Sequence, residues 1–221
     1  NASSMHQEGR LARRAIETAR ETLAELTAEM DNFRSAWDWA MAHHEFDHVH
    51  QMAKMLWYLF ELRTWFEEGE MVFSQAADAI QSYATETGNS AETLDIAHEL
   101  RGHAAFFMLR RGNTVAAFDA LTLVKAQLPA KASMYVQLYL GIVCRDLGKF
   151  TEANEAFQES LEKAEAYGDQ WLRSMAGQSL GIIALEMGEY KLAHRHLMDA
   201  LALAREIGDP TLIAHGLGFL S

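Results

Sequence analysis

Residues 141–169 read GIVCRDLGKFTEANEAFQESLEKAEAYGD, and residues 181–209 read GIIALEMGEYKLAHRHLMDALALAREIGD. The two segments align without a gap at a spacing of 40 residues, and both contain a glycine turn and end in Gly-Asp. Self-similarity at a fixed period is typical of repeat proteins, in which each unit buries its apolar face against its neighbours. The period therefore predicts a repeat fold, and it shifts the question of function from a catalytic site to a binding surface.

Apolar residues recur at helical spacing along most of the chain, which contains only two prolines. We expect a first long helix from about residue 8 to residue 41, with a break near residues 31–32. The other expected helices cover residues 47–63, 66–83, 91–111, 114–128, 131–147, 151–167, 170–187 and 190–207, and a last helix begins after Asp209-Pro210. The pattern predicts an all-α fold, a right-handed superhelical solenoid of antiparallel helix pairs.

Two glycines in each unit have distinct expected roles. Gly141 lies within the first helix, where the missing side chain lets the second helix approach closely. Gly148 ends that first helix, where a left-handed residue is needed. Reading backwards, Gly112 takes this turn position one unit earlier and Thr64 takes it in the unit before that, with Gly69 as the small residue of the following helix. Residues 87–90, Thr-Gly-Asn-Ser, are a separate stop-and-restart signal, with Gly88 as the C-cap of one helix and Ser90 as the N-cap of the next.

The register divides the chain into four helical hairpins and a truncated fifth. We expect residues 1–45 to form a helical segment that leads into one continuous array over residues 46–221. No stretch between them is long enough to act as a linker between independent domains. The first five residues look like an expression scar, and the last apolar pattern stops partway at Ser221, so we interpret the chain as a fragment of a longer protein.

The unit resembles the tetratricopeptide repeat in the order and spacing of Gly141, the turn at residues 148–150, Ala153 and Phe157. The usual unit has about 34 residues, whereas this one has 40 and no proline closes its second helix. The longer helices and the ending LAREIGDP at residues 203–210 look like the variant found in large bacterial STAND-type and LuxR-type ATPase regulators, similar to the maltose-regulon activator. In that family a nucleotide-binding domain precedes the repeats, so the resemblance implies such a neighbour in the parent chain.

Two further segments resemble the same regulators. Residues 31–40, DNFRSAWDWA, are similar to the D/E-x-N-L-R-x-A-L-x-W-A segment that precedes the repeats there, with Phe33 and Trp37 in place of leucines. Residues 63–69, RTWFEEG, resemble the G-x-x-x-E-G that follows it, with Thr64 in place of the glycine. These segments favour a transcriptional or signalling regulator, and they name no ligand.

Charge and composition exclude several classes of function. Nineteen basic and thirty-one acidic residues give a net charge of −12, which repels a phosphate backbone, so we expect no direct nucleic-acid binding through this segment. The longest apolar run, residues 55–60, is too short to span a bilayer, and we expect no membrane contact. The single cysteine, Cys144, excludes an internal disulfide and fits a reducing cytoplasm.

Residues 44–48 spell His-Glu-Phe-Asp-His, the H-E-x-x-H spacing of zinc proteases. That chemistry needs a continuous helix through the motif and a third ligand. Here the motif falls on the expected turn between two helices. We therefore expect no metal, no cofactor and no catalysis, with a zinc hydrolase as a remote alternative.

The dense aromatic cluster of residues 37–66 has two interpretations. Core packing of the first hairpins explains most of it. A partner-binding patch made of its exposed members is the alternative. The members are Trp37, Trp39, Trp57, Tyr58, Phe60, Trp65 and Phe66.

In tetratricopeptide arrays the first helices of successive hairpins line a concave groove. By register, its candidate residues here are Glu99, Phe106, Arg110, Tyr135, Leu138, Ile142, Arg145, Met175, Gln178, Ile182 and Glu186. Arg110 and Arg145 are suited to peptide carboxylates, and Tyr135 and Gln178 to a peptide backbone. We expect a non-catalytic module that binds a protein, a peptide or a small effector and relays occupancy to a neighbouring domain. A free-standing adaptor that scaffolds a multiprotein complex is the alternative.

Overall fold

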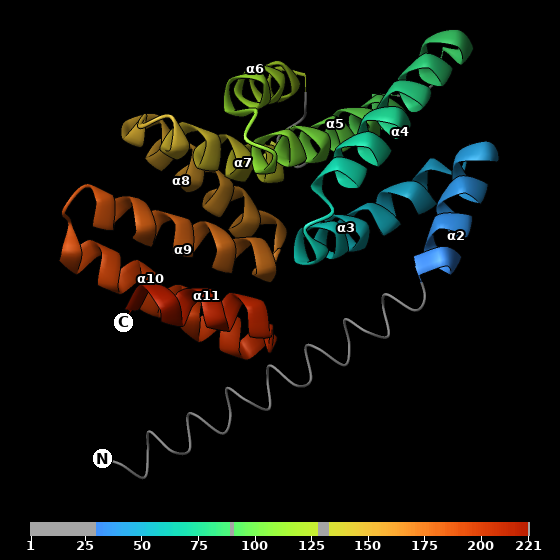
Figure 1. The fold of residues 1–221 in the computed structure, drawn as a ribbon. Helices are drawn as coiled ribbons and strands as arrows, with labels where there is room; N and C mark the ends of the chain where they lie inside the picture. Colours follow the sequence, from blue (N-terminus) through green and yellow to red (C-terminus); the bar gives the residue numbers. More distant parts are fainter. Residues whose placement is uncertain (1–29, 89–90, 128–132, 221) are drawn as a thin grey trace.

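The computed structural model describes residues 30–88, 91–127 and 133–220, and every regular element in these ranges is a helix. The helices are α2 (Met30–Ala42), α3 (Phe46–Arg63), α4 (Phe66–Thr87), α5 (Ala91–Arg110), α6 (Thr114–Lys125), α7 (Ser133–Asp146), α8 (Phe150–Tyr167), α9 (Gln170–Glu186), α10 (Tyr190–Ile207) and α11 (Pro210–Leu220). Each helix packs against the next along the chain, most extensively α4 with α5, α7 with α8 and α9 with α10 (Figure 1). The predicted all-α helical-repeat fold is confirmed. Residues 8–29 of the expected first helix and the start at Ser90 lie outside the described residues.

The turn positions behave as the register predicts. Gly148 and Gly188 have φ angles of 72° and 78°, in the left-handed region that glycine enters at least cost. Thr64 adopts the same conformation, with φ 57°, and its N–H donates to the Glu61 carbonyl at the end of α3. The substitution of threonine for glycine thus keeps the turn, although a side chain is rarely found at such an angle.

Helix pairs approach closely where the repeat places glycine. A Cβ atom added at Gly141 would overlap the ring of Phe157 on α8. At the equivalent Gly181, a Cβ atom would lie 2.6 Å from the Leu197 side chain on α10. Each glycine therefore makes room for a large apolar residue of its partner helix, which is the role that the sequence predicts.

The first hairpin departs from this pattern. Trp57 on α3 stands seven residues before the turn, the position that Gly141 occupies in α7. The centre of its ring lies 5.0 Å from that of Phe106, 6.0 Å from that of Tyr139 and 5.7 Å from that of Trp171. The indole thereby packs against α5, α7 and α9 together. Helix α4 instead runs beside α5 (Figure 1).

Side chains of α3 also reach the far end of the array. The Lys54 ammonium lies 3.2 Å from Asp169 at the start of α9, and the Tyr58 hydroxyl lies 2.9 Å from the Thr211 hydroxyl of α11. These contacts join residues 115 and 153 positions apart in the chain. The array therefore curves tightly enough for α3 to meet α9 and α11, and the first helices of the hairpins face a shared interior.

Candidate functional site

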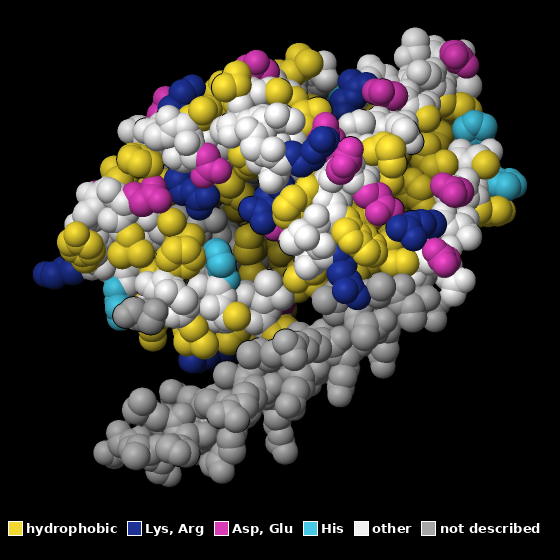
Figure 2. All heavy atoms as spheres, viewed as in Figure 1, with side chains coloured by type: hydrophobic (Ala, Val, Ile, Leu, Met, Phe, Trp, Pro, Cys, Tyr) yellow, Lys and Arg dark blue, Asp and Glu magenta, His cyan; other side chains and the backbone are white. Residues whose placement is uncertain are grey.

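A cavity of about 300 Å³, here called the first cavity, lies at this interior and is lined by α3, α5, α7, α9 and α11. Figure 2 shows hydrophobic side chains at the bottom of a hollow near the centre of one face. Rings and aliphatic chains form most of its lining, among them Trp57, Phe106, Leu138, Tyr139, Trp171 and Met175. The cavity is thus suited to an apolar group.

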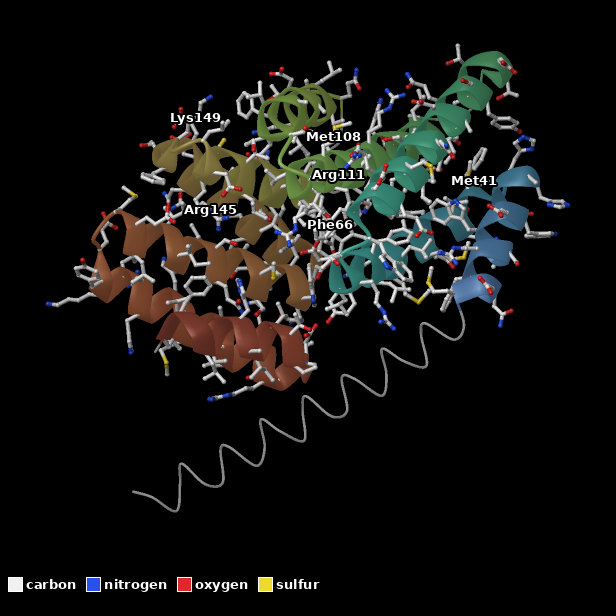
Figure 3. The ribbon with its side chains drawn as sticks, in the orientation of Figure 1. Met41, Phe66, Met108, Arg111, Arg145 and Lys149 are labelled. Atoms are coloured by element: carbon white, nitrogen blue, oxygen red, sulfur yellow. The ribbon has the colours of Figure 1, made fainter. Side chains whose placement is uncertain are left out.

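Charged side chains stand among this apolar lining. Arg110 Nε donates a hydrogen bond to Glu61 Oε2 at 3.2 Å, and Arg110 Nη2 forms an ion pair with Glu61 Oε1 at 3.1 Å. Burial raises the pKa of Glu61, against the opposing effect of Arg110. Arg145, beside α9 in Figure 3, pairs with its neighbour Asp146 at 2.8 Å. Both arginines already hold carboxylates of this chain, so a ligand carboxylate has to compete with Glu61 or Asp146.

Seven of the groove residues predicted from sequence line this first cavity. They are Phe106, Arg110, Leu138, Ile142, Arg145, Met175 and Ile182. Tyr135 lines a second cavity, described below. The structure thus gathers residues of three consecutive hairpins into one site, and their role in ligand binding stays a prediction.

Three predicted groove residues lie elsewhere. Glu99 accepts a hydrogen bond from His50 Nε2 at 3.0 Å, and Glu186 is exposed at the end of α9 without lining either cavity. Gln178 is only 1% exposed, and its amide donates to the Leu212 carbonyl at 2.9 Å. The sequence predicted Gln178 in the open groove, but α11 covers this side of α9. Gln178 therefore forms a hydrogen bond with α11 and is not available to a ligand.

A second cavity of about 380 Å³ shares Trp57, Tyr58 and Trp171 with the first and is lined also by Lys54 and Tyr135. The Tyr135 hydroxyl donates to Asp169 Oδ2 at 2.7 Å, and burial raises the pKa of Tyr135, so the hydroxyl stays protonated. Burial alone would raise the pKa of Asp169, but the Leu172 N–H, the Tyr135 hydroxyl and Lys54 hold it below its usual value. The carboxylate is therefore charged at neutral pH.

His103 is one of the residues that line this second cavity, and it is almost completely buried. Its Nδ1 is 2.9 Å from the Tyr139 hydroxyl. Burial lowers the pKa of His103 to about 4, so the imidazole is neutral at pH 7. Since it has no charge to offer a ligand there, it serves as a polar link between α5 and α7.

Sequence reasoning missed the contributions of α3 and α11. Trp57, Tyr58 and Glu61 come from the first hairpin, and Thr211 and His215 come from the last helix. Helix α3 reaches the site because the array curves, which a repeat register does not specify. One signal was present in the sequence: a tryptophan at the Gly141 position cannot pack as a glycine does, and so it marks α3 as an irregular helix.

The structure gives the H-E-x-x-H motif no metal-binding geometry. His44 lies in the turn before α3 with φ 57°, and its ring stacks 4.2 Å from the Tyr83 ring. The two histidines are therefore not on one continuous helix. Over the described ranges, no group of three or more His, Cys, Asp or Glu side chains is arranged to hold a metal ion.

Cys144 is buried, and burial raises the pKa of its thiol, which makes it a poor nucleophile.

The aromatic cluster is mostly core. Trp37, Trp57 and Phe60 are buried, in agreement with the first interpretation. Trp39 is 53% exposed and stacks on His43, with 4.4 Å between the ring centres. A single exposed tryptophan on α2 does not form a patch with the cavity residues.

None of the helices in the described ranges has the combined length and apolar character to cross a membrane.

Comparison with known proteins supports the repeat fold. Residues 131–206, which span α7, α8, α9 and all but the last residue of α10, match the family described as "Tetratricopeptide repeat". No curated protein matches the sequence. The crystal structure of BtubC (BKLC) from P. vanneervenii is similar, with a TM-score of 0.60 and 16% identity over 88% of this chain and 85% of that chain. The crystal structure of MamA protein gives a TM-score of 0.44 and 15% identity over 80% and 92%. The family match supports a protein-interaction module.

Proposed function

We propose that this chain is a non-catalytic module that binds a peptide segment of a partner protein in the first cavity. The observation that carries this proposal is the cavity itself, with an apolar lining and charged side chains on the inner face of a repeat array. Its volume lies at the lower end of the range of about 300–1,000 Å³ for ligand pockets. One large apolar side chain of the peptide fits such a space. The charged residues of the lining would then form hydrogen bonds with the peptide backbone.

The Trp57 side chain supports a ligand at this site. Its indole N–H is buried and has no hydrogen-bond acceptor in the part of the chain that the structure describes. A buried donor without an acceptor costs about 1–3 kcal/mol. Trp57 lines both cavities, so we infer that a bound peptide which turns the indole toward it supplies a carbonyl or carboxylate oxygen as the acceptor. A small effector with an apolar group and an acceptor oxygen is the other ligand class that meets these conditions.

We further propose that the parent protein is a bacterial signalling or transcriptional regulator. The two segments that resemble such regulators are joined, since Arg34 in residues 31–40 donates to Glu68 in residues 63–69 at 2.7 Å. Helix α3 connects this unit to the cavity, so a ligand that moves α3 also moves α2. A neighbouring nucleotide-binding domain in contact with α2 would respond to this movement. An adaptor without that domain is the alternative, and a Walker motif in the flanking reading frame distinguishes the two.

Met175→Glu tests the binding site. Peptides are first selected from a random displayed library against the unmodified chain, and their dissociation constants are then measured by fluorescence anisotropy. We expect Met175→Glu to weaken binding by at least about 30-fold, the loss typical of an interface hot spot, because a carboxylate would stand among apolar rings. Thermal melting of the variant verifies that it is folded.

Met198→Glu is the matched control, since Met198 is exposed on α10 and lines neither cavity. It should leave the dissociation constant within about 2-fold, as expected for a surface change away from the interface. Equal losses in the two variants, or no loss in either, would place the peptide elsewhere and sink the proposal. Small molecules that compete with the peptide only in the unmodified chain and in Met198→Glu would instead identify an effector site.

A further inference from the structure

The Lys54 ammonium occupies a cage of aromatic rings and a carboxylate at the second cavity. Its Nζ lies 5.4 Å from the centre of the Tyr135 ring, 5.7 Å from the centre of the Trp171 ring and 3.2 Å from Asp169 Oδ2. Aromatic faces attract cations at such distances, and a carboxylate adds to the attraction. Because Lys54 comes from α3 whereas Tyr135 and Trp171 belong to α7 and α9, this cation is contributed from across the interior.

The cage walls are held in place without Lys54. Asp169 Oδ1 accepts the Leu172 N–H at the start of α9, while Oδ2 accepts the Tyr135 hydroxyl. The Trp171 indole N–H donates to Asp209 Oδ2 at 3.1 Å, and Asp209 Oδ1 accepts two backbone N–H groups at the start of α11. Each ring is thus fixed by a carboxylate that also caps a helix. A site arranged in this way loses little entropy when a cation binds.

Lys54 itself is easily replaced. Its side chain is 55% exposed, and ion pairs of solvent-exposed lysines contribute little to stability. A flexible four-carbon stem lets the ammonium move into water without disturbing α3. The second cavity beside it has room for an incoming side chain, and a net charge of −12 attracts a cationic partner.

We propose that this cage is a binding subsite for a lysine or arginine side chain of the partner peptide, and that Lys54 is an internal occupant which the ligand displaces. The proposal rests on the proposed function, because the two cavities share Trp57, Tyr58 and Trp171 and so can hold neighbouring residues of one peptide. Displacement of Lys54 also removes a contact that joins α3 to α9. Cation binding therefore weakens the closure of the array.

Small amides test this subsite independently of any selected peptide. The probes are N-acetyl-lysine methylamide, its arginine counterpart and the uncharged N-acetyl-norleucine methylamide, and the readout is the Trp171 indole N–H resonance in ¹⁵N-labelled protein. We expect the two cationic amides to shift this resonance and the norleucine amide to leave it unchanged. Lys54→Met should bind the cationic amides about 3–10-fold more tightly, because it removes the competing ammonium from a cation–π site.

Lys125→Met is the control, since Lys125 forms a similar ion pair with Glu159 at 3.2 Å outside both cavities. It should bind the amides as the unmodified chain does. No binding of the cationic amides to Lys54→Met, or equal binding of the norleucine amide, would overturn the subsite. If Met175→Glu weakens the selected peptides but the amides do not behave as expected, the subsite is wrong and the proposed function stands. If the amides behave as expected but Met175→Glu has no effect on the peptides, the cage binds cations and the first cavity is not the peptide site.

Discussion

Phe157→Ala is expected to lower the free energy of unfolding by about 3–5 kcal/mol, the cost of removing a fully buried phenylalanine. Phe157 has an exposed fraction of 0%, and its ring fills the space that the absent side chain of Gly141 leaves between α7 and α8. Alanine at position 157 would leave a void between α7 and α8, because Gly141 on the facing helix has no side chain to fill it. Urea denaturation followed by circular dichroism measures the difference.

Phe150→Ala provides the comparison on the same helix. Phe150 begins α8 and is 36% exposed, so its truncation should cost about 1 kcal/mol, the average for point substitutions. Equal losses at positions 150 and 157 would show that the close approach of α7 and α8 at Gly141 is not what holds the hairpin together. A loss confined to position 157 supports the repeat register on which the fold rests.

Acidification from pH 7 to pH 4 is expected to remove about 3 kcal/mol of stability through His103 alone. Burial lowers its pKa to about 4 in the folded chain, whereas an unfolded histidine titrates near 6.5. As the pH falls through 6.5, the histidine is protonated in the unfolded chain but stays neutral in the folded chain. Proton binding therefore stabilises the unfolded state, and the free energy of unfolding decreases. The contribution is therefore fully present above about pH 6.5 and is lost toward pH 4.

His103→Gln isolates this effect, because glutamine keeps a polar partner for the Tyr139 hydroxyl without titrating. Glu99 raises the pKa of His103, while His50 and Lys54 lower it, and all three remain in the variant. The stability of the variant should fall less steeply with acid, with the two curves diverging by about 3 kcal/mol between pH 7 and pH 4. Parallel curves would mean that His103 is protonated in the folded chain.

The fold could be predicted well where the repeat is regular. The 40-residue period places α7–α10 to within a few residues, and Thr64 takes the left-handed turn that the register assigns to it. These features are local, since they depend on helix periodicity and on turn geometry. The packing of α3 was not predictable in this way. It depends on contacts such as that between Tyr58 and Thr211, which a period in the sequence does not encode.

The candidate site could be predicted in part for the same reason. Residues of α5, α7 and α9 such as Phe106 and Met175 share a face by register alone. Gln178 shares that register, but α11 covers it. Tyr135 and Lys54 meet only because the array curves far enough to bring α3 against α9, and curvature is set by the packing of whole hairpins.

The indole N–H resonances of the five tryptophans test the central claim most directly, since they report where a selected peptide binds. Trp57 and Trp171 line both cavities, whereas Trp39 is exposed on α2 outside them. We predict that the peptide shifts the resonances of Trp57 and Trp171 at the concentration at which it binds, and that Trp39 is unaffected. A saturating peptide that shifts Trp39 and leaves Trp57 and Trp171 in place would contradict the assignment of the interior cavity as the binding site.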